Sequence, residues 1–225
     1  MHIEPGLVVG GKAAIGLVTA SASLAWALWR ARQDAQRQGS LSLLLRTLVA
    51  AAAVFCFFEV LPHHPVGVSE VHLILGSSLL LVLGVAPAAL GLAGGLLVQG
   101  LFFAPADLPQ YGMNVTTLLA PLALTHALAE RLIPRQTAYV DLGYAQTLRL
   151  SLAYQGGIVA WVAFWALVGR GVSADNLVQI ASFGSAYMSV VLLEPLADLG
   201  LLALAKSARR LRGSSLVEPR LYHAA

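Results

Sequence analysis

The sequence predicts an all-α, polytopic membrane bundle of about seven transmembrane helices, folded as a single domain over residues 1–225. Composition is the first reason: 58% of the residues are hydrophobic and 11% are charged, whereas a soluble domain carries about 25% charged residues. The second reason is that apolar stretches recur along the chain, most near the ~20 residues that cross a bilayer. The third is that basic residues gather in alternate connections.

Seven apolar stretches account for the expected spans. They cover 7–29, 41–61, 71–84, 86–104, 114–133, 147–168 and 176–205. The third is short and runs into the fourth through "VAP", so we expect the two to form a tight hairpin of short or tilted spans. The seventh is long and contains Glu194, Pro195 and Asp198. A proline in such a stretch predicts a kinked or partly interfacial segment.

The 14 Lys and Arg residues orient the chain. They lie in or beside the connections after the first and fifth stretches and in the tail, with only Lys12 and Arg170 elsewhere. Basic residues favour the cytoplasmic side of a membrane. An odd number of spans therefore places the N-terminus outside and the basic tail, residues 206–225, inside. Within the tail, the segment from Lys206 to Arg212 either anchors the chain at lipid headgroups or docks an acidic partner, and we favour the anchor.

Other features bound the class of protein. The one cysteine, Cys56, lies in an apolar run, which excludes a disulfide framework. Residues 1–6 lack a basic segment and no small-residue cleavage site follows them, so we expect no cleavable signal. The sequence thus predicts a multi-pass protein of the cell (inner) membrane, with a lipid environment and no nucleic-acid partner. Its free N-terminal amine would lie at the outer face.

The first two residues offer three nitrogens that could bind one metal. These are the α-amine of Met1, the backbone nitrogen of His2 and the His2 imidazole. Binding through all three would close a five-membered and a six-membered chelate ring. Because the backbone nitrogen must lose its proton, the donor set favours tetragonal coordination of Ni(II) or Cu(II). Residues 1–6 are therefore a candidate metal-binding segment that needs a fourth ligand.

His72 is the best candidate for that fourth ligand. It lies at the outer start of the third stretch, beside the polar Ser69 and Glu70. An ionisable residue near membrane depth is a functional candidate by default. The other histidines have simpler interpretations. His63 and His64 are interpreted as solvated loop residues and His126 as a satisfied interior group. His223 lies in the tail, on the cytoplasmic side. The span carboxylates Glu59, Glu130 and Glu194 are interpreted as capping, paired or water-facing groups.

Three segments, in order, resemble the substrate-capture membrane subunit (S component, permease) of energy-coupling-factor (ECF) importers for cobalt and nickel. "MHIEPG" resembles the family's "MHIPDG" start, and "VGVSEVHLILG" resembles its "GGTSGHLxGG" segment. "LLVQGLFFAPADLPQYGMN" resembles a glutamine-and-aromatic run followed by "GxN". The resemblance covers about the first 125 residues and continues to the tail in hydropathy.

The resemblance implies a site and its ligands. In that family the N-terminus folds into the bundle from outside. The metal would be held by the Met1 amine, the His2 backbone nitrogen, the His2 ring and His72. Asn114, the asparagine of "GMN", matches a residue that pins the terminal loop. The substrate would be Co²⁺ or Ni²⁺.

The chain also departs from the family pattern around this site. Glu4-Pro5 replaces Pro-Asp, and Gly67 is the one glycine that remains in the "VGVSE" segment. Ser69 is retained. Glu70 replaces a small residue, and it could add a carboxylate to the site or attract cations. These changes leave open a divergent ECF-type subunit with another substrate.

The function implied is a transport component, not an enzyme. It would capture the metal outside and present it for ATP-driven import. Since no G-x-x-x-x-G-K-[ST] loop is present, it would need a coupling transmembrane subunit and two cytoplasmic ATPase subunits. A small accessory membrane subunit is left open.

Two alternatives belong to other classes. A membrane enzyme is disfavoured because no H-E-x-x-H motif occurs. A ligand-free multi-span assembly protein predicts that changes at His2 and His72 have no effect. Small residues at helical spacing, Gly16 with Ala20 and Gly91 with Gly95, would either dock a partner or pack the chain's own helices.

Overall fold

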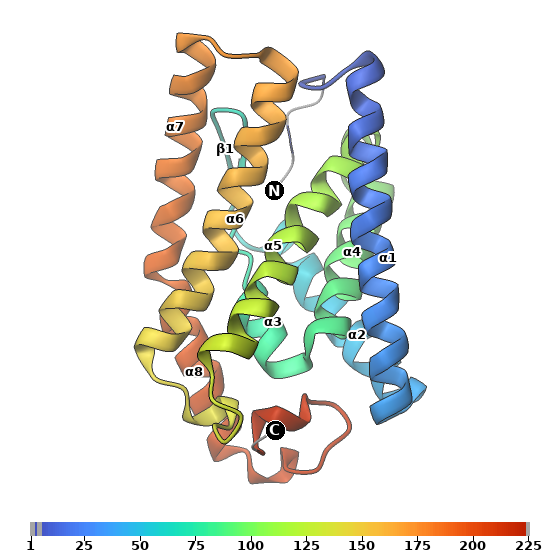
Figure 1. Cartoon of the computed structure of the whole chain (residues 1–225), viewed down its shortest axis with the longest axis vertical. Coiled ribbons are helices and arrows are strands. Elements are labelled where there is room, and N and C mark those ends of the chain that lie inside the picture. Colours follow the sequence, from blue (N-terminus) through green and yellow to red (C-terminus); the bar gives the residue numbers. More distant parts are fainter. Residues whose placement is uncertain (1–2, 4–5, 224–225) are drawn as a thin grey trace.

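The computed structural model describes residues 3 and 6–223, which form a mostly helical bundle (Figure 1). Its helices of eight residues or more are α1 (Ala13–Gln38), α2 (Ser40–Phe55), α3 (Gly76–Leu83), α4 (Val85–Phe102), α5 (Tyr111–Leu132), α6 (Tyr144–Arg170), α7 (Ala174–Met188) and α8 (Glu194–Ser207). Two short strands, β1 (His64–Val66) and β2 (Ser69–Val71), pair as an antiparallel hairpin.

Five segments of the described chain are long and apolar enough to cross a membrane. They are Gly10–Gln38, Ser40–Val60, Val85–Phe102, Tyr144–Arg170 and Ala174–Ser207. The predicted helical membrane bundle is thus confirmed. The count of seven spans stays a prediction.

The third expected span differs most from a regular helix. Its first residue, Val71, belongs to β2, residues 72–75 have no regular structure, and only α3 is helical. An eight-residue helix is about 12 Å long, too short to cross a bilayer. The expectation of an all-α chain missed the β-hairpin, because strands of three residues are too short to show a period-2 pattern.

The kink expected in the seventh stretch is present. A 3₁₀ turn, Ser189–Leu192, separates α7 from α8, and Pro195 lies in the first turn of α8. Proline fits there because it lacks the backbone N–H that a first turn leaves unbonded. The break brings the carboxylates of α8 to the inner face of the bundle.

The small-residue pairs pack the chain's own helices. A Cβ on Gly91 would lie 2.3 Å from the Cβ of Ala50, so α4 lies very close to α2. A Cβ on Gly16 would lie 2.9 Å from Cγ of Met113, which brings α1 close to α5. Small side chains allow such close approach within a membrane. The docking interpretation is not needed to explain them.

Large apolar side chains cover the outer surface of the bundle. On α1 and α2 they include Leu17, Val18, Leu28, Leu41 and Leu48, all more than half exposed. Exposed apolar stripes of this extent suit contact with lipid rather than water.

One end of the bundle is closed by residues 209–223, and we call it the tail end (Figure 1). The guanidinium of Arg46, fully buried in α2, pairs with Asp34 at 2.5 Å and lies 3.8 Å from Glu218 of the tail. It also donates to the carbonyl of Leu83 at 2.8 Å. A buried arginine with these partners ties α1, α2, α3 and the tail together.

Further hydrogen bonds fix the tail. The hydroxyl of Ser42 donates to the carbonyl of Ser215 at 2.5 Å, and that of Tyr222 donates to the carbonyl of Ala205 at 2.6 Å. Leu221 is fully buried. The part of the tail beyond Arg212 is therefore packed against the helices.

Candidate functional site

The opposite end of the bundle, which we call the hairpin end, carries β1 and β2 (Figure 1). Gly67 lies in the turn between the strands with φ +59°, a conformation that glycine adopts at little cost. A Cβ at Gly67 would lie 2.2 Å from the backbone oxygen of Gln179 in α7. The next residue, Val68, is fully buried. The hairpin is therefore held tightly against α7.

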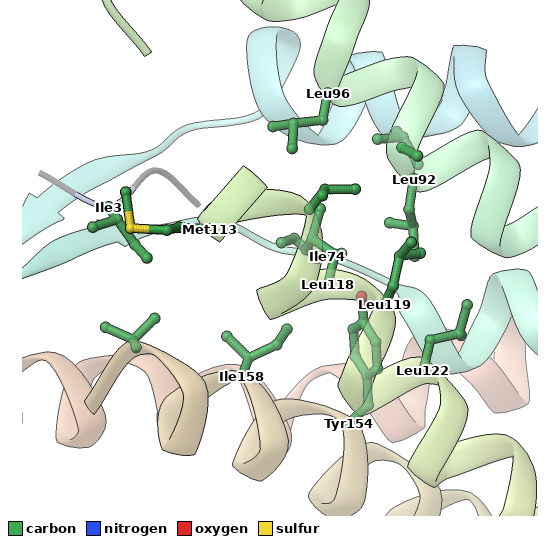
Figure 2. Close-up of a cluster of buried hydrophobic side chains, with 14 of the residues drawn as sticks. Ile3, Ile74, Leu92, Leu96, Met113, Leu118, Leu119, Leu122, Tyr154 and Ile158 are labelled. Atoms are coloured by element: carbon green, nitrogen blue, oxygen red, sulfur yellow. The ribbon is translucent and has the colours of Figure 1, made fainter. Parts of the chain in front are cut away.

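The start of the described chain lies against this hairpin. Ile3 forms an antiparallel bridge with Ser69, and its backbone N–H donates to Oδ1 of Asn114 at 2.9 Å. Ile3 is fully buried, and Figure 2 shows its side chain beside that of Met113. Met1 and His2, the first two expected ligands, lie outside the described residues.

His72 follows β2 directly and is 1% exposed. Its Nε2 lies 3.0 Å from Oε2 of Glu70. Its ring stacks on that of His63, with centroids 4.8 Å apart, and meets the ring of Phe58 edge-on at 5.0 Å. A neutral imidazole is the form that binds metals.

A second carboxyl group lies near Glu70. Asp107, in the 3₁₀ turn Pro105–Gln110 that precedes α5, has its pKa raised by burial and by the negative charge of Glu70. Two carboxyl groups close together favour a cation or a proton between them. They give the hairpin end a negative charge beside His72.

The remaining histidines add no further buried imidazole beside His72. His63 is exposed and its ring contacts the carbonyl of Leu61, while His64 is exposed in β1. His126 lies 2.7 Å from Arg30 and 3.6 Å from Glu130. Together with His223, His126 lines a cavity of about 310 Å³ at the tail end.

A comparison with known families decides the class. The model of the cobalt uptake substrate-specific transmembrane region, CbiM, matches residues 2–211. The chain belongs to the CbiM family. A protein of Haemophilus influenzae named as a candidate metal transport protein is 28% identical over 193 residues, which cover 85% of this chain and 81% of that protein. No solved structure gives a significant match.

Membership of the CbiM family makes the chain a multi-pass membrane component of metal transport. Within the described residues, no three His, Cys, Asp or Glu side chains gather closely enough to hold a metal ion. The structure brings Ser69, Glu70, His72 and Asn114 to the hairpin end, around Ile3. A complete metal site in this CbiM-family chain would need donors besides these.

Sequence reasoning missed some residues of this region. It did not foresee the stacking of His63 on His72 or the closeness of Asp107 to Glu70. Asp107 lies 37 positions after Glu70 in sequence, and no local pattern joins them.

Proposed function

We propose that this chain is the substrate-specific subunit of an ATP-driven ECF-type importer. It captures Co²⁺, or Ni²⁺, at the hairpin end, which faces outside. The ligands are the Met1 amine, the His2 backbone nitrogen, the His2 ring and His72. The metal is substrate, not a resident cofactor.

The observation that carries this proposal is the position of Ile3. It is bonded covalently to His2, and consecutive Cα atoms lie 3.8 Å apart across a trans peptide. Ile3 is fixed by the bridge to Ser69, three positions before His72, and by Asn114. This placement supports a site in which the N-terminal nitrogens meet the buried imidazole.

Glu70 supports the site in a second way. Its carboxylate holds His72 through Nε2. A carboxylate on one ring nitrogen fixes the tautomer of an imidazole and makes the other nitrogen more basic toward a metal. In the metal-free protein Glu70 keeps the imidazole in place, and with Asp107 it attracts cations to the hairpin end.

The proposed topology has seven passes, with β2, residues 72–75 and α3 together making the third. The N-terminus then lies outside and the tail inside, where the basic residues favour the cytoplasm. A coupling transmembrane subunit and two cytoplasmic ATPases would supply the work of transport. A small accessory membrane subunit is compatible with this assembly.

Metal content tests the proposal. The full chain, purified with a free N-terminus after growth in cobalt, nickel and copper, would be measured by mass spectrometry beside His2→Ala and His72→Ala. We expect about one tightly held metal ion per chain to remain after purification of the wild type and none to remain after purification of either variant, since each change removes a ligand. The matched control is His64→Ala, an exposed histidine eight residues before His72 that should keep the metal.

Two results would contradict the proposal. Folded wild-type protein without metal would favour a ligand-free assembly protein or a subunit for another substrate. Unchanged metal content after acetylation of the Met1 amine would refute the chelate, because the acetylated nitrogen could no longer bind the metal.

A further inference from the structure

A second group of polar side chains is buried deep in the bundle, away from the hairpin. Glu194 and Asp198 lie one turn apart on α8 and are 0% and 1% exposed. Ser77 and Ser78, in the first turn of α3, face them, and α6 contributes Ser151 and Gln155. All six residues are buried. Ionisable residues at such depth in a membrane protein are costly and usually functional.

The contacts in this cluster require one more proton or cation than its ionised carboxylates and hydroxyls supply. Oγ of Ser77 lies 2.9 Å from Oε1 of Glu194 and 2.8 Å from Oδ2 of Asp198. A hydroxyl carries one hydrogen and can donate it to one carboxylate only. The other contact needs a proton on the carboxyl group, or a cation between the oxygens.

The remaining oxygens of both carboxylates are already in use. Ser151 donates to Oε2 of Glu194, which also accepts from Nε2 of Gln155 at 2.8 Å. Ser78 donates to Oδ1 of Asp198. Among the side chains that the structure describes, no Lys, Arg or His forms an ion pair with either carboxylate. Two unpaired negative charges in such a place would be strongly destabilising.

Unpartnered polar atoms next to the cluster point to a ligand there. Among the described residues, Oε1 of Gln155 and the hydroxyl of Tyr154 are fully buried and have no hydrogen-bond partner. A Cβ on Gly76 would lie 2.2 Å from both Cε1 and Cζ of Tyr154, so the hydroxyl end of this ring lies against the residue before Ser77. Figure 2 shows that this hydroxyl points toward the side of Ile74. Buried polar groups without partners usually bind water or an ion.

Part of this cluster lies a few residues after His72 in the sequence. Nε2 of Gln155 donates to the carbonyl of Ile74 at 2.9 Å, and Ile74 is two residues after His72. Ser77 follows three residues later. A cation that leaves the imidazole toward the tail end would therefore meet this cluster.

We propose that Glu194, Asp198, Ser77 and Gln155 form a second cation site, inside the bundle, for the divalent metal on its way to the tail end. The site holds a proton when it is empty. When the metal binds, its bonds to the carboxylate oxygens replace the carboxyl O–H bond, and the proton leaves to water. This rests on the proposed function, that the chain captures a divalent metal, and adds where that metal goes next.

The donor set suits a relay site. All its donors are oxygens of carboxylate, hydroxyl and amide groups, which hold a transition metal less tightly than nitrogen donors do. Divalent cations bind oxygens at about 2.0–2.6 Å. Two carboxylates that already share one hydroxyl can close on a single ion with small movements. A weaker second site accepts the metal without trapping it.

Cobalt titration of the full chain in detergent tests this, with the nitrogen site removed by His72→Ala. We expect this variant to bind about one Co²⁺ per chain, at least about tenfold more weakly than the wild-type protein. Binding should release a proton, which a pH indicator in weak buffer detects. Adding Glu194→Gln and Asp198→Asn should abolish both binding and proton release. The matched control is Asp175→Asn, an exposed carboxylate on α7, which should change neither.

The same experiment separates this proposal from the previous one. With His72 intact, Glu194→Gln/Asp198→Asn should keep the tight cobalt, which also reports a folded protein. If His72→Ala leaves tight binding intact, the proposed function fails. If His72→Ala binds no cobalt, or if the carboxylate changes leave its weak binding unaltered, the second site does not exist.

Infrared spectroscopy of the His72→Ala protein gives a test that does not depend on folding of the carboxylate variants. A carbonyl stretch from a protonated carboxyl group should be present without metal and disappear when Co²⁺ is added. A band that is missing from the start, or that cobalt leaves unchanged, would overturn the proposal.

Discussion

The two proposed metal sites are built in different ways. At the hairpin end, a turn, a short strand and the start of the chain present an imidazole nitrogen. Inside the bundle, three helices present carboxylate, hydroxyl and amide oxygens. The first arrangement depends on contacts of loops, and the second on the packing of α3, α6 and α8. Substitutions that loosen the loops should therefore weaken metal capture and leave the inner cluster intact.

Gly67→Ala should have the largest effect on the hairpin end. Its Cβ would lie 2.2 Å from the backbone oxygen of Gln179, and alanine at positive φ costs about 1–2 kcal/mol. We expect the hairpin to shift and cobalt affinity to fall at least about tenfold, or 1.4 kcal/mol. Titration calorimetry measures this. Gly94→Ala is the control, since a Cβ there meets no atom within 4 Å. If the weak, inner binding is lost as well, the two regions are not independent.

Asn114→Ala should have an intermediate effect. It removes the acceptor of the Ile3 N–H, and a buried donor left without a partner costs about 1–3 kcal/mol. The start of the chain should detach and cobalt binding should weaken by about tenfold. Asn114→Asp keeps an acceptor in the same place and should bind cobalt nearly as the wild type does. Equal losses in both variants would contradict the role given to this hydrogen bond.

Asp107→Asn should have the smallest effect, seen in the pH dependence of stability. Because the folded-state pKa of Asp107 is raised by burial and by Glu70, its ionised form lowers stability at neutral pH. This cost disappears as the pH falls through the raised pKa. Asp107→Asn should therefore melt about 1–2 °C higher than wild type at pH 7, and the difference should vanish below about pH 4. If the difference in melting temperature between Asp107→Asn and wild type grew as the pH fell, this explanation would be refuted.

Much of the helical layout was predictable, because long apolar stretches carry a strong signal. The stretches 86–104 and 114–133 agree with α4 and α5 to within three residues. The third stretch was less predictable. A pairing of two three-residue strands depends on Gly67 and on the contact with α7, and neither is visible in a hydropathy pattern.

The residues of the hairpin end were found from sequence because they stand together, in "VGVSEVH". Those of the inner cluster were not. Ser151 and Gln155, and likewise Glu194 and Asp198, are four residues apart, which places each pair on one face of a helix. The two faces meet only because α8 restarts after the 3₁₀ turn at Ser189–Leu192. From sequence, Glu194 is therefore interpreted only as a capping, paired or water-facing group.

The packed tail has a consequence for how the protein is made. Ser215, Glu218 and Tyr222 leave the ribosome after every helix whose ends they close. Until then Arg46 can pair with Asp34 but not with Glu218, and this end of the newly inserted bundle stays open to water. Closure of the tail is therefore a late step of assembly. A chain that stops before Ser215 should be recognised by quality-control proteases even though all its helices are in the membrane.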